Sequence, residues 1–187
     1  LFDRYAHNFE YNLVNKLGYN APFLFKETLC NLNLTNKKFN KAIDLGCGTG
    51  LVGVEFRNIV NTLTGIDLSE KMIQKAEEKK VYNDLIVDDL VDGLQALETN
   101  FDLFISADVF VYLGDLRPLF EGVSEHVNNK SLFVFSTEDM AGDGFCLQKT
   151  CRFAHSKNYI LSTASDFGFQ LEYFERHNLR KDKGKWL

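Results

Sequence analysis

The sequence predicts an α/β fold with a mostly parallel central sheet, helices on both faces and an N-terminal helical cap. Short apolar runs alternate with helical patterns from about residue 40 almost to the end, which is typical of parallel strands joined by crossover helices. Only two prolines, Pro22 and Pro118, interrupt this alternation. The length of 187 residues suggests one domain. We expect a cap over residues 1–39 and an α/β core over residues 40–187.

The apolar runs and turn residues assign each element in turn. The expected strands are 41–45, 62–66, 84–87, 101–106, 131–135 and 169–175. The expected helices between them are 51–59, 70–79, 89–96, 116–127 and 157–167, with two more at 8–16 and 21–32 in the cap. The helix at 70–79 has the clearest pattern, because Ser69 is a good N-cap and Met72, Ile73 and Ala76 form an apolar stripe.

Composition limits the partners of the chain. The net charge of −5 and the pI near 5.4 argue against nucleic-acid binding, which needs clustered Lys and Arg. The four cysteines contain no C-x-x-C pair that would suggest zinc, so we expect reduced thiols, no metal site and a cytoplasmic protein. No apolar run approaches the ~18 residues that span a bilayer, so no membrane partner is expected.

The stretch DLGCGTGLVG, residues 44–53, contains two overlapping glycine patterns. Gly48, Gly50 and Gly53 fit the G-x-G-x-x-G pattern of dinucleotide enzymes, in which a pyrophosphate rests on a helix N-terminus. Read from Gly46 instead, the loop is G-x-G-x-G with an acid, Asp44, two residues ahead. A carboxylate close to a pyrophosphate is unfavourable, whereas beside the loop it can meet a cation. The second pattern therefore predicts a ligand with a positive group.

Residues 42–50, AIDLGCGTG, resemble the first motif of class I S-adenosylmethionine (SAM)-dependent methyltransferases, whose cofactor carries an α-ammonium and no phosphate. The resemblance implies a Rossmann-like methyltransferase fold, SAM as cofactor and S-adenosylhomocysteine (SAH) as product. It assigns the cofactor loop to Asp44, Gly46, Cys47, Gly48 and Gly50.

The resemblance continues at the ends of the next strands. Asp67, followed by Leu68, stands where the family binds both ribose hydroxyls, although an NAD enzyme would hold its ribose at about the same place. Asp89 stands at the adenine site, with the backbone amide of Leu90 facing the ring and Asp88 as the competing choice. Asp89 can equally be the N-cap of the following helix. Three further residues complete the expected cofactor site: Met72, which is more often core at this spacing, Ala107 at the methionine end, and Tyr5.

A narrower resemblance covers most of the chain. LFDRYAHNFEYNLVNKLGYNAP, SADVFVYLGDLRPLF and CRFAHSKNYI are similar to predicted bacterial methyltransferases that often follow tetratricopeptide repeats. In that comparison Tyr5 reaches the SAM carboxylate from the cap, and an upstream repeat domain is a possible partner. The repeats are absent from this sequence, and it stops at Lys185-Trp186-Leu187, where the family would form its last strand. We therefore expect a missing or shortened final strand.

Four residues are assigned to catalysis or substrate binding. His155 titrates near neutral pH and could take a proton from a nucleophile, although a lone histidine is more often a satisfied structural group. Asp108 joins it as a catalytic candidate because it stands at the methionine end of the cofactor. Arg152 could clamp a substrate carboxylate or phosphate, or serve as a structural ion-pair partner. Tyr112 is the fourth, a candidate substrate contact.

These residues predict methyl transfer from SAM to an unidentified acceptor, expected to be a small molecule, with a protein substrate left open. The N/D-P-P-Y/F motif is missing after the strand at 101–106, so amide and adenine N-methylation are less expected. Two alternatives remain: a non-catalytic SAM-binding module, favoured if Phe110, Tyr112 or Phe145 plug the substrate pocket, and an NAD-dependent oxidoreductase.

Overall fold

The computed structural model describes residues 18–178, 181–182 and 185–186, and its centre is a parallel sheet in the order β3-β2-β1-β4-β5. The strand bounds are β1 Phe39–Leu45, β2 Val60–Asp67, β3 Asp84–Val87, β4 Phe101–Ser106 and β5 Val127–Phe135. This confirms the predicted parallel α/β sheet for the first five strands.

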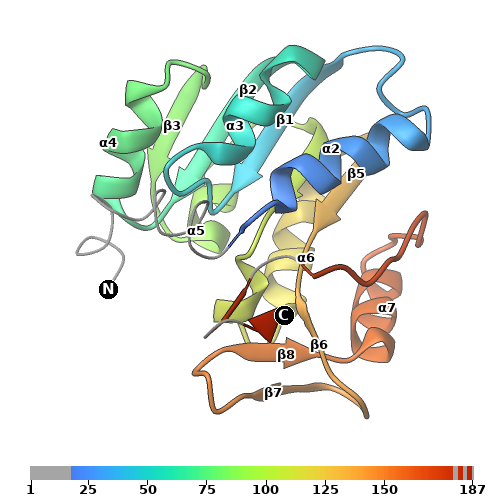
Figure 1. Ribbon diagram of the computed structural model, residues 1–187. Helices are drawn as coiled ribbons and strands as arrows, with labels where there is room; N and C mark the ends of the chain where they lie inside the picture. Colours follow the sequence, from blue (N-terminus) through green and yellow to red (C-terminus); the bar gives the residue numbers. More distant parts are fainter. Residues whose placement is uncertain (1–17, 179–180, 183–184, 187) are drawn as a thin grey trace.

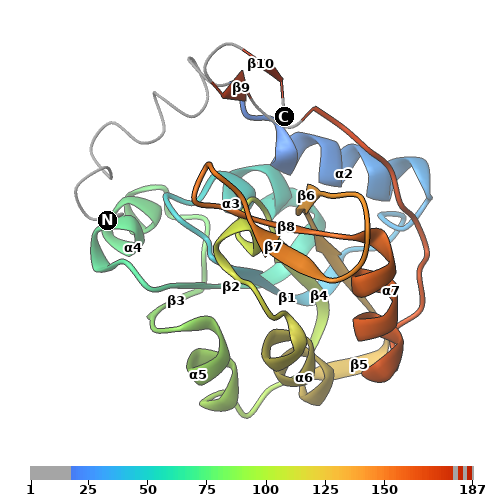
Figure 2. The ribbon, with the colours of Figure 1, turned by 90° about the horizontal axis from the view of Figure 1, so that it is seen from below.

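Helices cover both faces of this sheet. Figure 2 shows α2, α3 and α4 on one side and α5 and α6 on the other, and α7 packs against α6. Their bounds are α2 Ala21–Asn31, α3 Leu51–Phe56, α4 Glu70–Glu78, α5 Leu90–Gln95, α6 Arg117–Glu125 and α7 Lys157–Asp166, with 3₁₀ turns η2 Arg57–Ile59 and η3 Phe110–Tyr112. Ser69 caps α4 by accepting a hydrogen bond from the Met72 amide, as predicted, and Ser156 caps α7 by accepting one from the Tyr159 amide.

Each face of the sheet buries its own apolar cluster, because β1 and β4 are covered on both sides. One cluster lies between the sheet and the helices α2 and α3, and it includes Phe25 and Leu29 of α2 and Val52 and Phe56 of α3. The other holds a group of aromatic rings in which Phe120 of α6 contacts four others. These four are Phe110, Phe133, Phe135 and Phe169.

The described part of the expected cap is a helix of the sheet's outer layer. α2 packs beside α3, and the ammonium of Lys26 bonds the carbonyl of Glu55 at 2.7 Å and its carboxylate at 3.0 Å. The predicted helix at 8–16 and Tyr5 lie outside the described residues, so the proposed closure of the ligand site by residues 1–39 stays a prediction.

The predicted strand at 169–175 is wrong. Gly168 ends α7 with a φ of +82°, and the following residues form no strand and pair with none of the described sheet. Side chains hold this segment instead. The ammonium of Lys157 lies 4.3 Å from the ring centre of Phe174, and Arg176 pairs with Asp139 at 2.7 Å. Alternating apolar residues indicated an extended chain, but they do not specify a hydrogen-bonding partner.

A small second sheet escaped the sequence analysis. It has the order β6-β8-β7, with β6 Glu138–Asp139, β7 Phe145–Leu147 and β8 Phe153–His155, and Figure 1 shows it beyond the end of β5. Its strands have two or three residues each, too short for a recognisable alternation. Near the C-terminus, β9 Lys181–Asp182 and β10 Lys185–Trp186 pair antiparallel. Within the described ranges, no helix has the length and apolar character needed to cross a membrane.

Candidate cofactor and acceptor site

The predicted cofactor residues gather where the parallel strands end. β1 ends at Leu45, β2 at Asp67, β3 at Val87 and β4 at Ser106, and β1 lies between β2 and β4. Since all of these strands run in one direction, the loops after them meet at one edge of the sheet (Figure 1). Ligands of open α/β sheets bind at this edge.

The glycine loop leaves β1 directly after Leu45, as the reading from Gly46 predicts. The amides of Gly46 and Cys47 both donate to the carbonyl of Ile66, at 2.8 and 2.9 Å, which ties the loop to β2. Gly46, Gly48 and Gly50 have φ values of +78°, +52° and +88°, a region that only glycine enters without strain.

The glycines of this stretch differ in what they face. A Cβ on Gly46 would lie 2.4 Å from Cγ2 of Val109, so only a residue without a side chain lets the loop after β4 pack this closely. A Cβ on Gly48 would meet nothing within 4 Å, which makes Gly48 the open position of the loop. A Cβ on Gly53 would lie 2.5 Å from the ring of Tyr82, so this glycine accommodates a side chain of the protein itself.

Asp44 is a buried carboxylate whose two oxygens have different surroundings. Oδ2 accepts a hydrogen bond of 2.6 Å from the hydroxyl of Tyr82, while no donor among the described residues reaches Oδ1. Burial raises the pKa of Asp44 to about 7; the bond from Tyr82 opposes this increase, and the charge of Asp67 adds to it. An unpaired buried carboxylate is costly, and a cationic group would remove that cost. The residues therefore fit a cofactor that carries an ammonium.

Asp67 joins the glycine loop to the start of α4. Its Oδ2 accepts from the Gly48 amide at 2.8 Å and its Oδ1 from the Ser69 amide at 2.8 Å. Both oxygens are therefore held at the tip of β2. Leu68 beside it is 70% exposed, an open apolar surface of the kind that an aromatic base can cover.

The two acids after β3 have different bonds. Asp89 is the N-cap of α5, because its Oδ1 accepts from the Val91 amide at 2.9 Å. Asp88 accepts from the Asp89 amide at 2.8 Å. The cap role of Asp89 is thus present, and it leaves the second carboxylate oxygen available for an adenine amine. Leu90 packs partly against the core.

Met72 points into the protein interior. Its side chain is 1% exposed on the inner side of α4, which supports the core interpretation rather than direct cofactor contact.

Past β4, the predicted substrate residues form one charged group. The Arg152 guanidinium lies 3.4 Å from Asp108, 3.7 Å from Glu138 and 3.2 Å from the hydroxyl of Tyr112. Ser136 accepts a hydrogen bond from the Asp108 amide at 2.9 Å, and Asp108 has a φ of +60°. Arg152 therefore has two carboxylate partners within the protein, which supports the ion-pair interpretation over a free anion clamp.

The three aromatic residues that could plug a substrate pocket lie in different environments. Phe110 is fully buried and stacks on Phe135 with ring centres 4.5 Å apart, so it belongs to the core. Tyr112 is 42% exposed and Phe145 39% exposed.

Ala107 directly after β4 is partly buried against the core.

His155 is buried at the end of β8 with both ring nitrogens bonded. Nε2 lies 3.0 Å from the carbonyl of Gly114 and must donate to it, so Nδ1 accepts from the Thr137 hydroxyl at 2.6 Å. The imidazole also stacks on the ring of Tyr159. The predicted catalytic role stays untested, and the geometry favours the structural alternative.

Replacement of His155 by glutamine should reduce the decrease in the free energy of unfolding between neutral and acidic pH. Burial lowers the pKa of His155 below the ordinary 6.5, so the unfolded chain binds the proton more readily. The folded state therefore loses stability as the pH falls from about 6.5 through the lower folded-state pKa. A glutamine amide can donate to Gly114 and does not titrate.

Urea unfolding at pH 7.5 and 5.5 measures this effect, with exposed His177→Gln as the matched control. Wild type and the control should lose more stability between the two pH values than His155→Gln does. Equal losses in all three proteins would contradict the structural assignment.

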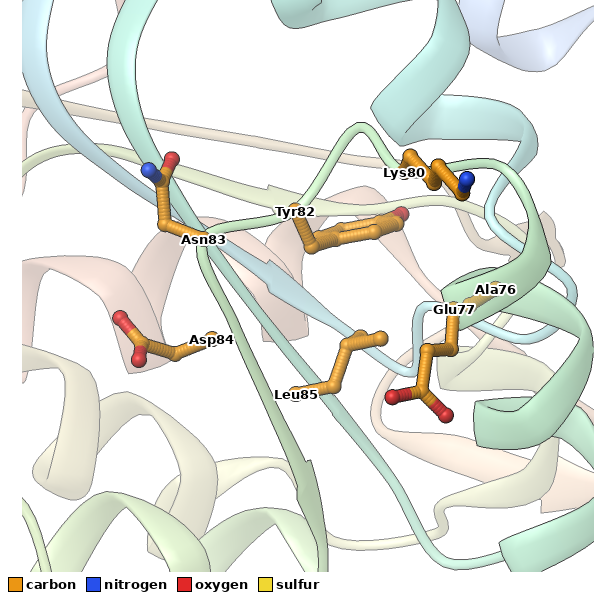
Figure 3. Close-up of a pocket in the computed structure, with 7 residues that line it drawn as sticks. All are labelled: Ala76, Glu77, Lys80, Tyr82, Asn83, Asp84 and Leu85. Atoms are coloured by element: carbon orange, nitrogen blue, oxygen red, sulfur yellow. The ribbon is translucent and has the colours of Figure 1, made fainter.

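A separate cavity of about 320 Å³ opens between the end of α4 and β3 (Figure 3). It is lined by Ala76, Glu77, Lys80, Tyr82, Asn83, Asp84 and Leu85. The Tyr82 ring lies across it, and Asn83 and Asp84 point away from that ring. None of the predicted cofactor residues lines this cavity.

Within the described residues, no group of three or more His, Cys, Asp or Glu side chains could hold a metal ion.

Sequence reasoning missed Tyr82, Glu138 and Thr49. Tyr82 precedes β3 and reaches Asp44 only through the folding of the chain, so no spacing signals it. Glu138 depends in the same way on the small second sheet. The Thr49 hydroxyl is buried in the glycine loop without a partner among the described residues, and its place between Gly48 and Gly50 was an available signal.

Residues 42–130 match the sequence model of a methyltransferase domain family. This segment, a little under half of the chain, is thus similar to methyltransferase domains. The match begins within β1 and runs to β5, so it contains Asp44, the glycine loop, Asp67, Asp89 and Asp108.

Curated relatives of this domain include malonyl-[acyl-carrier protein] O-methyltransferases from two bacteria. The protein from Bacillus anthracis is 32% identical over 100 residues, which are 52% of this chain and 37% of that protein. The protein from Bacillus cereus is 26% identical over 139 residues, 73% of this chain and 48% of that protein. The chain thus spans less than half the length of these two relatives.

Solved structures confirm the Rossmann-like methyltransferase fold. A SAM-dependent methyltransferase from Clostridium acetobutylicum aligns with a TM-score of 0.63 at 19% identity, covering 89% of this chain and 87% of that one. Magnesium protoporphyrin IX methyltransferase from Synechocystis with bound SAM aligns with a TM-score of 0.62 at 17% identity, covering 88% of this chain and 75% of that one.

Proposed function

We propose that the chain is a SAM-dependent methyltransferase that transfers a methyl group to a small-molecule acceptor. The observation that carries this proposal is Asp44, a buried carboxylate beside the glycine loop whose Oδ1 has no donor among the described residues. A ligand with an ammonium satisfies this oxygen, and a pyrophosphate would be repelled by it. The methyltransferase domain match at residues 42–130 supports the same assignment.

The remaining cofactor contacts follow the order of the strands. We assign Gly48 to the cofactor loop, Asp67 to the ribose hydroxyls and Leu68 to the adenine. The empty space beside Gly48, the position of Asp67 at the tip of β2 and the 70% exposure of Leu68 support these assignments. Asp89 accepts from the adenine amine, with Asp88 as the alternative, and the Leu90 amide faces the ring. The resemblance also assigns Ala107 and Asp108 to the methionine end and Tyr5, which lies outside the described residues, to the carboxylate.

SAM supplies a methyl group on a positively charged sulfur. The acceptor's lone pair forms a bond to the methyl carbon while the carbon–sulfur bond breaks, and SAH keeps that electron pair. The protein therefore contributes alignment and exclusion of water more than acid–base chemistry. Asp108 and Arg152 form an ion pair on the expected acceptor side, and Tyr112, which is 42% exposed and bonded to Arg152, is the candidate contact for the acceptor.

Several comparisons support an acceptor group of small-molecule size, either free or attached to a carrier protein. Two relatives are named for methylation of malonyl-[acyl-carrier protein], and one structural neighbour for magnesium protoporphyrin IX. A protein acceptor is the second possibility. The narrower resemblance to methyltransferases that follow tetratricopeptide repeats supports an upstream repeat domain as a partner.

Thermal unfolding with added ligands tests the cofactor assignment. SAH at about 100 times its Kd should stabilise the folded state by about 2.7 kcal/mol. For a domain of this size, this corresponds to a rise in Tm of roughly 5–10 °C. NAD and NADP at equal concentrations should leave the Tm unchanged, because Asp44 offers them no favourable contact. Stabilisation by a dinucleotide but not by SAH would refute the proposal and favour an oxidoreductase.

A further inference from the structure

Tyr82 reaches the centre of the cofactor site from a remote segment. It lies in the loop before β3, yet its ring passes between the glycine loop, α3 and β2. Three glycines leave the space that the ring occupies. A Cβ on Gly53 would lie 2.5 Å from the ring, one on Gly65 3.0 Å, and one on Gly50 3.1 Å.

The hydroxyl of Tyr82 is bonded on both sides. It donates to Oδ2 of Asp44 at 2.6 Å and accepts from the Gly53 amide at 3.1 Å. A hydrogen bond to an ionised carboxylate is stronger than one between neutral groups. The amide of α3 thus orients the hydroxyl, and the hydroxyl fixes which oxygen of Asp44 remains without a donor.

Among the described residues, no other titratable group around Asp44 favours its ionisation. These groups are Asp67 at the end of β2, whose charge raises the pKa of Asp44, and the Cys47 thiol in the glycine loop, whose own pKa is raised by burial and by both acids. Neither group supplies positive charge. Burial acts in the same direction, and the hydrogen bond from Tyr82 is the contact that favours the charged carboxylate. Without that bond, a larger fraction of Asp44 would be protonated at neutral pH.

We propose that Tyr82 is a positioning residue of the cofactor site, which keeps Asp44 ionised and oriented and thereby sets the pH range in which the protein binds the ligand's ammonium. This inference rests on the proposed function, because it takes SAM or SAH as the ligand. Tyr82 acts through Asp44 and needs no contact with the ligand.

The test is calorimetric titration with SAH between pH 5.5 and 8.0 for wild type and Tyr82→Phe. In wild type the affinity should rise with pH through about 7, where Asp44 loses its proton. Loss of one hydrogen bond to a charged group should move this midpoint upward by about one pH unit. The variant should then bind about twofold more weakly at pH 8 and about tenfold more weakly at pH 6.

Three controls distinguish an effect of Tyr82 on Asp44 from an effect of Tyr82 on the stability of the fold alone. Phenylalanine keeps the ring against the three glycines, so the Tm shows whether the variant folds. Asp44→Asn should bind SAH weakly with little pH dependence. The third control is the ligand 5′-methylthioadenosine, which has the adenosine and the thioether but no ammonium, and its affinity should not follow the pH in any of the proteins.

The outcomes are distinguishable. A widening gap between wild type and Tyr82→Phe as the pH falls supports the inference. A gap of constant size at every pH, or a wild-type affinity that does not depend on pH, overturns it and leaves the proposed function standing. Failure of wild type to bind SAH at any pH refutes the proposed function itself.

Discussion

Asp67→Ala is expected to weaken SAH binding by roughly tenfold to a hundredfold. Hydrogen bonds to a charged acceptor contribute about 1.5–3 kcal/mol each, and about 1.4 kcal/mol corresponds to a factor of ten in affinity. The structure adds a second contribution, because Asp67 also accepts from the Gly48 and Ser69 amides. Its removal therefore loosens the glycine loop as well as the ribose contact.

Calorimetric titration with SAH measures this loss, and two variants serve as controls. Asp67→Asn keeps one side-chain oxygen as an acceptor and should lose less affinity than the alanine variant. Asp84→Ala removes the same charge from an exposed position at the start of β3 and should leave the affinity unchanged. Wild-type affinity in Asp67→Ala would exclude Asp67 from the cofactor site.

Phe120→Ala is expected to lower the free energy of unfolding by about 3–5 kcal/mol, the usual cost of removing a buried phenylalanine ring. Phe120 is 1% exposed on α6, and its ring contacts Phe110, Phe133, Phe135 and Phe169. The cavity left behind would touch α6, β5 and the chain after α7. Relaxation of any one element cannot fill it.

Urea unfolding at neutral pH measures this change. Phe23→Ala is the matched control, because it removes the same ring from a position on α2 that is 55% exposed. The control should change the free energy of unfolding by no more than about 0.5 kcal/mol. A small effect of Phe120→Ala would mean that the aromatic cluster on this face does not stabilise the fold as its burial indicates.

Local patterns predicted the elements whose signals lie within a few consecutive residues. The loop at Gly46, the cap at Ser69 and the first five strands belong to this group, because apolar period and capping chemistry are local. Asp44 could be placed at the end of β1 for the same reason.

The features that the sequence did not predict depend on contacts between distant segments. Tyr82 lies 38 residues from Asp44 in the chain, and Glu138 pairs with Arg152 only after β6 and β8 have come together. The segment 169–175 illustrates the opposite error, because its alternation suited a strand for which the described sheet provides no partner edge.

The contact between Gly53 and Tyr82 explains why the chain carries an apparent dinucleotide fingerprint. Gly53 has no positive φ, so its backbone alone would accept alanine, and only the nearby ring requires a residue without a side chain. The third glycine of G-x-G-x-x-G is therefore required only because Tyr82, 29 positions away, packs against it. Substitutions at these two positions are coupled, and related chains with a small residue in place of Tyr82 could lose the fingerprint while keeping the same cofactor.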